Sequence, residues 1–266
     1  MMNAGAQPGN GFLAMRIVAR GVMIELLRRK DLYVLTILMG AFLAGVLAAR
    51  SIGIENASTG TFLLNLGLTL GCICAHILTL IFAARQIPDE VENRTLHTML
   101  AKPVSRMQFL LGKWISCALA GAVSLIALQA LCLICTPWME AYSSLMLAQM
   151  FILECASLAL MSALAILFSL LAPRGAGIVL LAFIGALGPR LTDLCKARYA
   201  DSPLAGATGW LLEYLPDFSR LNLVTRFTDG IAALPAGEFA GLLLYAVVLI
   251  FAALVFSAVI FERRPL

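Results

Sequence analysis

The chain has 266 residues, of which 61% are hydrophobic and only 13% are charged, and its formal net charge is +4. Soluble domains carry about 25% charged residues, so this chain lacks the polar groups that would cover a surface in water. We therefore expect an all-α integral membrane protein, because helices satisfy their own backbone hydrogen bonds in lipid. We expect no nucleotide-hydrolysing domain beside the helix bundle, since 266 residues leave little room for one.

Residues 1–30 are predicted to form a cytoplasmic, interfacial amphipathic segment. Arg16, Arg20 and Glu25 interrupt the apolar residues of this stretch, so it lacks the unbroken apolar core of a signal peptide. Its apolar residues recur every three to four positions, which indicates a helix with one apolar face. Such a helix lies along the membrane surface.

Residues 31–266 contain six apolar runs, which predict a single six-helix transmembrane domain. A spanning helix needs roughly 20 residues, and every run except the fifth approaches or exceeds that length. The fifth run is either extended at its ends or forms a broken or partial span. The predicted spans are 32–49, 61–84, 115–136, 146–172, 176–189 and 239–261.

The distribution of basic residues predicts the orientation of these spans. If the N-terminus is inside, most of the 19 Lys and Arg residues fall in the short inner segments. Cytoplasmic loops of membrane proteins carry such an excess, which accounts for the positive charge without any nucleic-acid partner. We therefore predict a multi-pass protein of the plasma (inner) membrane, surrounded by lipid, with both termini cytoplasmic.

The long connection 190–238 is predicted to lie on the outer side. Its apolar piece 204–215 is too short to span, and Pro203, Pro216 and Pro235 interrupt the segment. Irregular backbone at membrane depth must be buried in protein or line a cavity. We expect re-entrant or interfacial helices here, with an ordinary extracellular loop as the alternative.

The cytoplasmic loop 85–114, between the second and third spans, carries clear helix signals. Pro88 suits the first position of a helix, and acidic residues including Glu92 follow in the first turns, where the helix dipole favours them. Pro103 would stop the helix. The pattern predicts a short helix over 88–102.

This predicted helix is amphipathic. Leu96, Met99 and Leu100 recur at the spacing of one helix face, so they need a surface to bury against, either lipid headgroups or a soluble partner. Ser105 and Gln108 then form a capping box, which predicts a second helix that continues into the third span.

The loop resembles the first cytoplasmic loop of type-2 ABC exporter permeases. Within that family, the loop is most similar to the subgroup that includes the membrane subunit of the nitrous-oxide-reductase maturation transporter. Residues 215–222 are similar to the segment before that family's last span, whereas Arg94 stands where many members have Gly. The matching loop residues are Glu92, Thr95, Leu96, Leu100, Ala101, Pro103, Val104, Ser105, Arg106, Leu110, Leu111, Gly112 and Lys113.

The resemblance implies a type V ABC exporter-like permease, which would move an unidentified substrate using ATP. It would work as a pair of membrane subunits, identical or paralogous. Each would dock a separate cytoplasmic ABC ATPase subunit through the 88–102 helix, acting as a coupling helix, so that the chain itself would be no enzyme. The implied coupling residues are Glu92, Thr95, Leu96, Met99, Leu100, Pro103 and Arg106.

Polar residues inside the spans form a second candidate site. An acid at the centre of a bilayer costs on the order of 2.5–3.5 kcal/mol, so Glu154 should be protonated, paired or facing a cavity. With Gln129 and His76, it is a candidate for the transport pathway. A buried hydrogen bond between helices is the alternative for Glu154.

Two other functions compete with transport. An intramembrane metalloenzyme would need three protein ligands, with His76 and Glu154 as candidates, but no HExxH motif exists and His97, the only other histidine, lies in the loop. We therefore expect no metal and no cofactor, and we expect the seven cysteines to act as small apolar residues. A membrane anchor that recruits a cytoplasmic protein would explain the amphipathic loop, but not the polar residues in the spans.

Overall fold

The computed structural model describes residues 57–92, 106–135, 143–171 and 216–263, together with positions 37, 40, 41, 44 and 45. Every regular element in these ranges is a helix, in agreement with the predicted all-α class. The isolated positions between 37 and 45, within the predicted first span, are helical as well.

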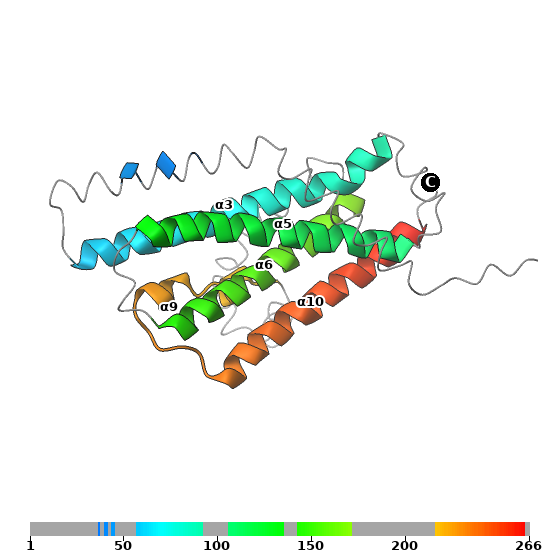
Figure 1. The fold of residues 1–266 in the computed structure, drawn as a ribbon. Helices are drawn as coiled ribbons and strands as arrows, with labels where there is room; N and C mark the ends of the chain where they lie inside the picture. Colours follow the sequence, from blue (N-terminus) through cyan, green and yellow to red (C-terminus); the bar gives the residue numbers. More distant parts are fainter. Residues whose placement is uncertain are drawn as a thin grey trace, which may run out of the picture.

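Four long helices dominate the described chain: α3 (Ala57–Glu92), α5 (Arg106–Cys135), α6 (Ser144–Leu171) and α10 (Ala236–Arg263) (Figure 1). Each is long and apolar enough to cross a membrane. The candidate spans within them are Thr61–Gln86, Met107–Leu133, Ser144–Leu171 and Ala236–Phe261. These four overlap the second, third, fourth and sixth predicted spans, although the third begins at Met107 and not at residue 115. The chain is a multi-pass membrane protein.

Other predicted segments lie outside the described residues and stay predictions. They are the N-terminal segment 1–30, the fifth span 176–189, most of the first span 32–49, residues 93–105 of the cytoplasmic loop and residues 190–215 of the outer connection.

The boundaries of the cytoplasmic loop differ from the prediction at one end. The expected helix start at Pro88 is corrected, because α3 runs through Pro88 without a break and ends at Glu92. Proline lacks a backbone N–H and costs about 3 kcal/mol inside a helix, which is why its position suggested a start. At the other end, α5 begins at Arg106, directly after the predicted cap Ser105, and continues through the third span as expected.

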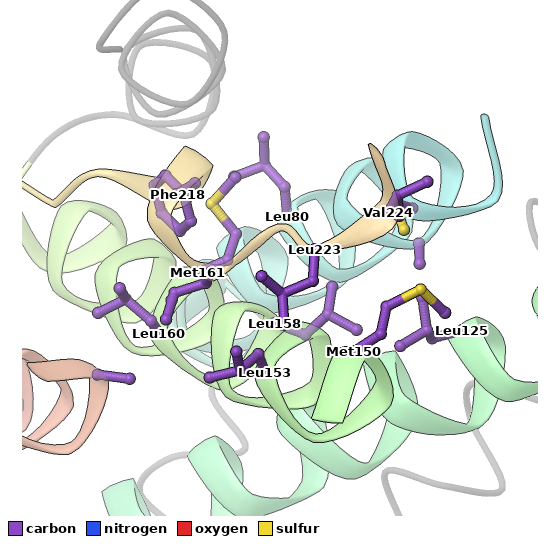
Figure 2. Close-up of a cluster of buried hydrophobic side chains, with 14 of the residues drawn as sticks. Leu80, Leu125, Met150, Leu153, Leu158, Leu160, Met161, Phe218, Leu223 and Val224 are labelled. Carbon is purple, nitrogen blue, oxygen red and sulfur yellow. The ribbon is translucent and has the colours of Figure 1, made fainter. Parts of the chain in front are cut away.

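Helices α3, α5 and α6 pack against one another, and α10 packs mainly on α6 (Figure 1). Lipid tails are as apolar as leucine, so this association depends on close packing more than on water exclusion. Figure 2 shows part of the shared apolar core, in which side chains of α3, α5 and α6 meet those of the segment before α10. Its labelled residues are Leu80, Leu125, Met150, Leu153, Leu158, Leu160, Met161, Phe218, Leu223 and Val224.

Gly121 of α5 marks a close approach of three helices. A Cβ atom there would lie 2.5 Å from Oγ1 of Thr79 on α3 and 3.5 Å from Cβ of Leu158 on α6. Thr79 is held in place because its hydroxyl donates to the carbonyl of Ala75 at 2.8 Å. A glycine therefore permits the three helices to meet at this level.

The described end of the connection 190–238, residues 216–235, is folded back onto the bundle. It contains the 3-10 helix η2 (Phe218–Leu221) and α9 (Val224–Thr228), which contact α6, and α9 also contacts α3. The Asp217 side chain caps η2 by accepting from the Ser219 backbone N–H at 3.0 Å. Phe218 and Phe227 are buried, so this part is packed protein rather than an extended loop.

Gln149 of α6 fixes the next stretch of this connection. Its side-chain Nε2 donates to the Leu234 carbonyl at 3.0 Å, and its Oε1 accepts from the Leu234 backbone N–H at 2.8 Å. One buried amide thus satisfies both backbone groups of a residue outside any helix, which irregular backbone at membrane depth requires.

Candidate functional site

A buried polar cluster lies where α3, α5 and α6 meet. Gln129 of α5 is 0% exposed and Glu154 of α6 is 1% exposed. The Nε2 atom of Gln129 donates to Sγ of Cys72 on α3 at 3.0 Å. The Glu154 side chain lies next to the same thiol. One cysteine therefore links polar residues of all three helices.

His76 extends the cluster by one turn of α3. Its Nδ1 lies 2.9 Å from the Cys72 carbonyl oxygen, and its Nε2 lies 2.8 Å from Oγ of Ser157. Because a carbonyl only accepts, Nδ1 carries a proton, and in the neutral ring Nε2 is then the acceptor for the Ser157 hydroxyl. The edge of the imidazole also meets the Phe218 ring, with centroids 6.2 Å apart, so η2 covers this side of the cluster.

The structure thus brings together the three predicted pathway residues, Glu154, Gln129 and His76, through partners that the sequence analysis did not single out. The sequence predicts only a packing role for Cys72, as a small apolar residue, and makes no prediction for Ser157. The available signal was spacing: Cys72 lies four residues before His76, and Ser157 three residues after Glu154, so each pair shares a helix face.

Two oxygen atoms in this cluster are left without a donor among the described residues. They are Oε1 of Glu154 and Oε1 of Gln129, both buried. A buried polar atom without a partner costs about 1–3 kcal/mol, so such atoms are rare in native proteins. The cluster therefore has acceptor capacity that the described side chains do not use.

Metal ligands do not gather in the same way. Within the four described ranges, no three His, Cys, Asp or Glu side chains come together in an arrangement that could hold a metal ion. None of the described cysteines forms a disulfide bond, and all of them except Cys155 are buried. His76 and Glu154 consequently have no third metal ligand in this part of the chain.

A second group of contacts joins α3 and α5, the two helices that flank the predicted cytoplasmic loop. Lys113 of α5 and Gln86 of α3 are both buried, and Nζ of Lys113 donates to Oε1 of Gln86 at 2.7 Å. The same ammonium lies 5.9 Å from the centroid of the Phe109 ring, one turn earlier on α5. These contacts therefore link α3 and α5 near the ends that the loop connects.

These contacts reach the other two long helices. The Phe109 ring stacks on Phe261 of α10, with centroids 6.2 Å apart and an interplanar angle of 20°. Beside Lys113, the indole N–H of Trp114 donates to the Ala159 carbonyl of α6 at 3.0 Å. We call Gln86, Phe109, Lys113, Trp114 and Phe261 the inner clamp, because they join all four long helices next to the loop.

The comparison with protein families agrees with this architecture. A family model described as "ABC-2 family transporter protein" matches residues 9–266. The chain belongs to the ABC-2 transporter family. As a family member it is a membrane permease component of an ABC transporter, and the family works with an ATP-binding subunit. No curated protein matches the chain.

The predicted coupling residues of this ABC-2 permease lie at the edge of the description or beyond it. Glu92 is the last residue of α3, and Arg106 is the first residue of α5. The predicted loop residues between them, Thr95, Leu96, Met99, Leu100 and Pro103, lie outside the described residues. Their roles, and the resemblance to the nitrous-oxide-reductase maturation subgroup, stay predictions.

Proposed function

We propose that this ABC-2 permease exports a substrate across the plasma membrane with ATP hydrolysed by a separate cytoplasmic subunit. Two permease subunits, identical or paralogous, would form the membrane unit, each with six spans and both termini in the cytoplasm. The observation that carries the proposal is the family match over residues 9–266. The resemblance of the loop to exporter permeases supports the direction of transport.

In this proposal, the loop that follows α3 docks the ATP-binding subunit and transmits its movement. The inner clamp supports this role, because Nζ of Lys113 donates to Oε1 of Gln86 at 2.7 Å and so links α5 to α3 near the loop. A push on the loop would therefore move α3 and α5 together. The Phe109–Phe261 stack would carry the same movement to α10.

The polar cluster is proposed to lie on the transport pathway. Glu154, Gln129 and His76 belong to three helices that would have to separate for a substrate to pass. Glu154 and Gln129 are sealed from solvent in this arrangement, which corresponds to a closed pathway. The alternative, a purely structural hydrogen-bond cluster between helices, predicts the same contacts without any effect on transport.

Reconstitution tests the proposed function. We expect the permease to co-purify with a co-expressed candidate ABC ATPase subunit. The complex should then support ATP-dependent transport across the membrane of lipid vesicles. A membrane anchor would bind the subunit but give no transport. An intramembrane metalloenzyme would retain stoichiometric metal after purification and would need no ATP. Either of these results would replace the proposal.

The proposed topology makes a separate prediction. Single cysteines placed near Ile54 and near Tyr142 should react with an impermeant thiol reagent added to intact cells, because both positions fall in predicted outer loops. A cysteine at Thr98 should be protected in intact cells and should react in inverted vesicles, which serve as the matched control. Labelling of the Thr98 site from outside would reverse the assigned orientation.

A further inference from the structure

We propose that Glu154 holds a proton on its Oε1 atom and donates it to Oε1 of Gln129. The role of this proton in transport rests on the transport pathway proposed above. The protonation itself does not depend on that pathway. Its chemistry follows from the two buried oxygens that lack donors among the described residues. Both side chains lie next to the same thiol, that of Cys72, within one buried cluster.

The numbers of hydrogen-bond donors and acceptors on Glu154 and Gln129 favour this arrangement. An ionised carboxylate only accepts hydrogen bonds, as does the carbonyl oxygen of a glutamine side chain. With Glu154 ionised, Oε1 of Glu154 and Oε1 of Gln129 would both be acceptors facing a dry interior. A single proton on Glu154 converts one of them into a donor, and one O–H···O bond then satisfies both atoms.

The groups that surround Glu154 also favour the neutral carboxylic acid. The titratable groups that flank Glu154 and Cys72 are His76 on α3, Cys132 on α5 and Cys155 on α6. The neutral His76 ring satisfies both of its contacts, with one nitrogen as donor and the other as acceptor, so the cluster needs no cation at this position.

Among the described residues, neither basic side chain of the covering segments, Arg220 of η2 or Arg226 of α9, forms an ion pair with Glu154. On η2, Arg220 forms an ion pair with Asp217 at 3.5 Å and lies over the Tyr245 ring of α10. A buried carboxylate without a counter-ion is strongly disfavoured in an apolar interior, whereas the neutral acid is not. The neutral, hydrogen-bonded Glu154–Gln129 pair therefore suits the sealed bundle.

This state has a consequence for the proposed pathway. When the helices separate and water enters, a hydrated Glu154 can release its proton to solvent and become a carboxylate. The pathway would then present a negative charge only while it is open. On closing, the carboxyl group would take up a proton again and return to Gln129.

Infrared spectroscopy of the purified permease in lipid near neutral pH tests the proposal. A carboxyl group that keeps its proton gives a carbonyl band separate from those of carboxylates and amides. We expect such a band in the parent, its complete loss in Glu154→Gln, and a shift to higher frequency in Gln129→Leu, which removes the acceptor. Gln149→Leu removes a buried amide elsewhere on α6 and should leave the band unchanged.

The Glu154→Gln variant should fold like the parent, because its amide N–H can donate to Gln129 in place of the acid. If the parent has no band that Glu154→Gln removes, Glu154 is ionised and holds another cation or a water molecule, and the proposal fails. If the band is present but does not shift in Gln129→Leu, the assignment of Gln129 as acceptor fails. The measurement uses neither ATP nor substrate, so these outcomes leave the proposed export function to be judged by reconstitution.

Discussion

Leu100→Asp is expected to abolish coupled transport while the permease still inserts into the membrane. Leu100 belongs to the predicted apolar face of the cytoplasmic loop helix, which we propose docks the ATP-binding subunit. Burying a leucine side chain is worth roughly 1.5–3 kcal/mol, so its loss should weaken docking about 10- to 100-fold. The aspartate would add the cost of a charge facing an apolar groove. The measurements are co-purification of the ATP-binding subunit and transport per ATP hydrolysed.

A matched change on the same helix provides the control. Thr98 lies off the predicted apolar face, so Thr98→Ala should bind the ATP-binding subunit and couple like the parent. The inner clamp makes the expected defect specific, because Lys113 and Gln86 lie within the membrane helices and keep their contact when the loop surface changes. If Leu100→Asp binds and couples like the parent, the loop helix is not the coupling element.

The sequence predicted the described part of the fold well because lipid leaves few alternatives. Each of the four described spans must be a long apolar helix, and such runs are visible without any knowledge of packing. The loop boundaries were harder to predict, because they depend on local signals. The capping box at Ser105 correctly placed the start of α5, whereas Pro88 suggested a helix start inside what is one continuous helix. A proline is compatible with both environments, and only the surrounding structure decides between them.

The candidate site shows the same division between local and long-range information. Glu154, Gln129 and His76 were recognisable because a polar residue inside an apolar run is costly. Their meeting point was not predictable, because it joins residues far apart in the chain: Gln129 and Cys72 are 57 residues apart, and His76 and Ser157 are 81 apart. Cysteine looks like a small apolar residue in sequence, so its role as the shared neighbour of Gln129 and Glu154 emerges only from the packing of three helices.

The buried position of Lys113 was also hidden in the sequence. The resemblance included Lys113 as part of a loop motif, but a lysine at the end of a span ordinarily extends its ammonium toward the water interface. In the structure this ammonium instead turns to Gln86 and to the Phe109 ring. That choice depends on the relative placement of α3 and α5, and therefore on residues such as Gly121 that allow the helices to approach.

Gly121→Val is expected to cause the largest loss of stability of any single change considered for the bundle. The new Cβ would lie 2.5 Å from Oγ1 of Thr79, and Cβ of Leu158 at 3.5 Å limits movement to the other side. Thr79 could move away only by giving up its 2.8 Å bond to the Ala75 carbonyl. Overpacking of this kind typically costs about 1–3 kcal/mol, and the branched valine adds two further methyl groups to accommodate.

The comparison variant Gly241→Val separates packing from helix propensity. Valine is no worse than glycine in a helix interior, so neither substitution should weaken the helix itself. A Cβ at Gly241 on α10 meets no described atom within 4 Å, whereas one at Gly121 meets two helices. Thermal unfolding of the two purified variants in the same detergent should therefore show a clearly lower midpoint for Gly121→Val alone. Equal midpoints would contradict the close approach of α3, α5 and α6, and with it the geometry that brings Glu154, Gln129 and Cys72 together.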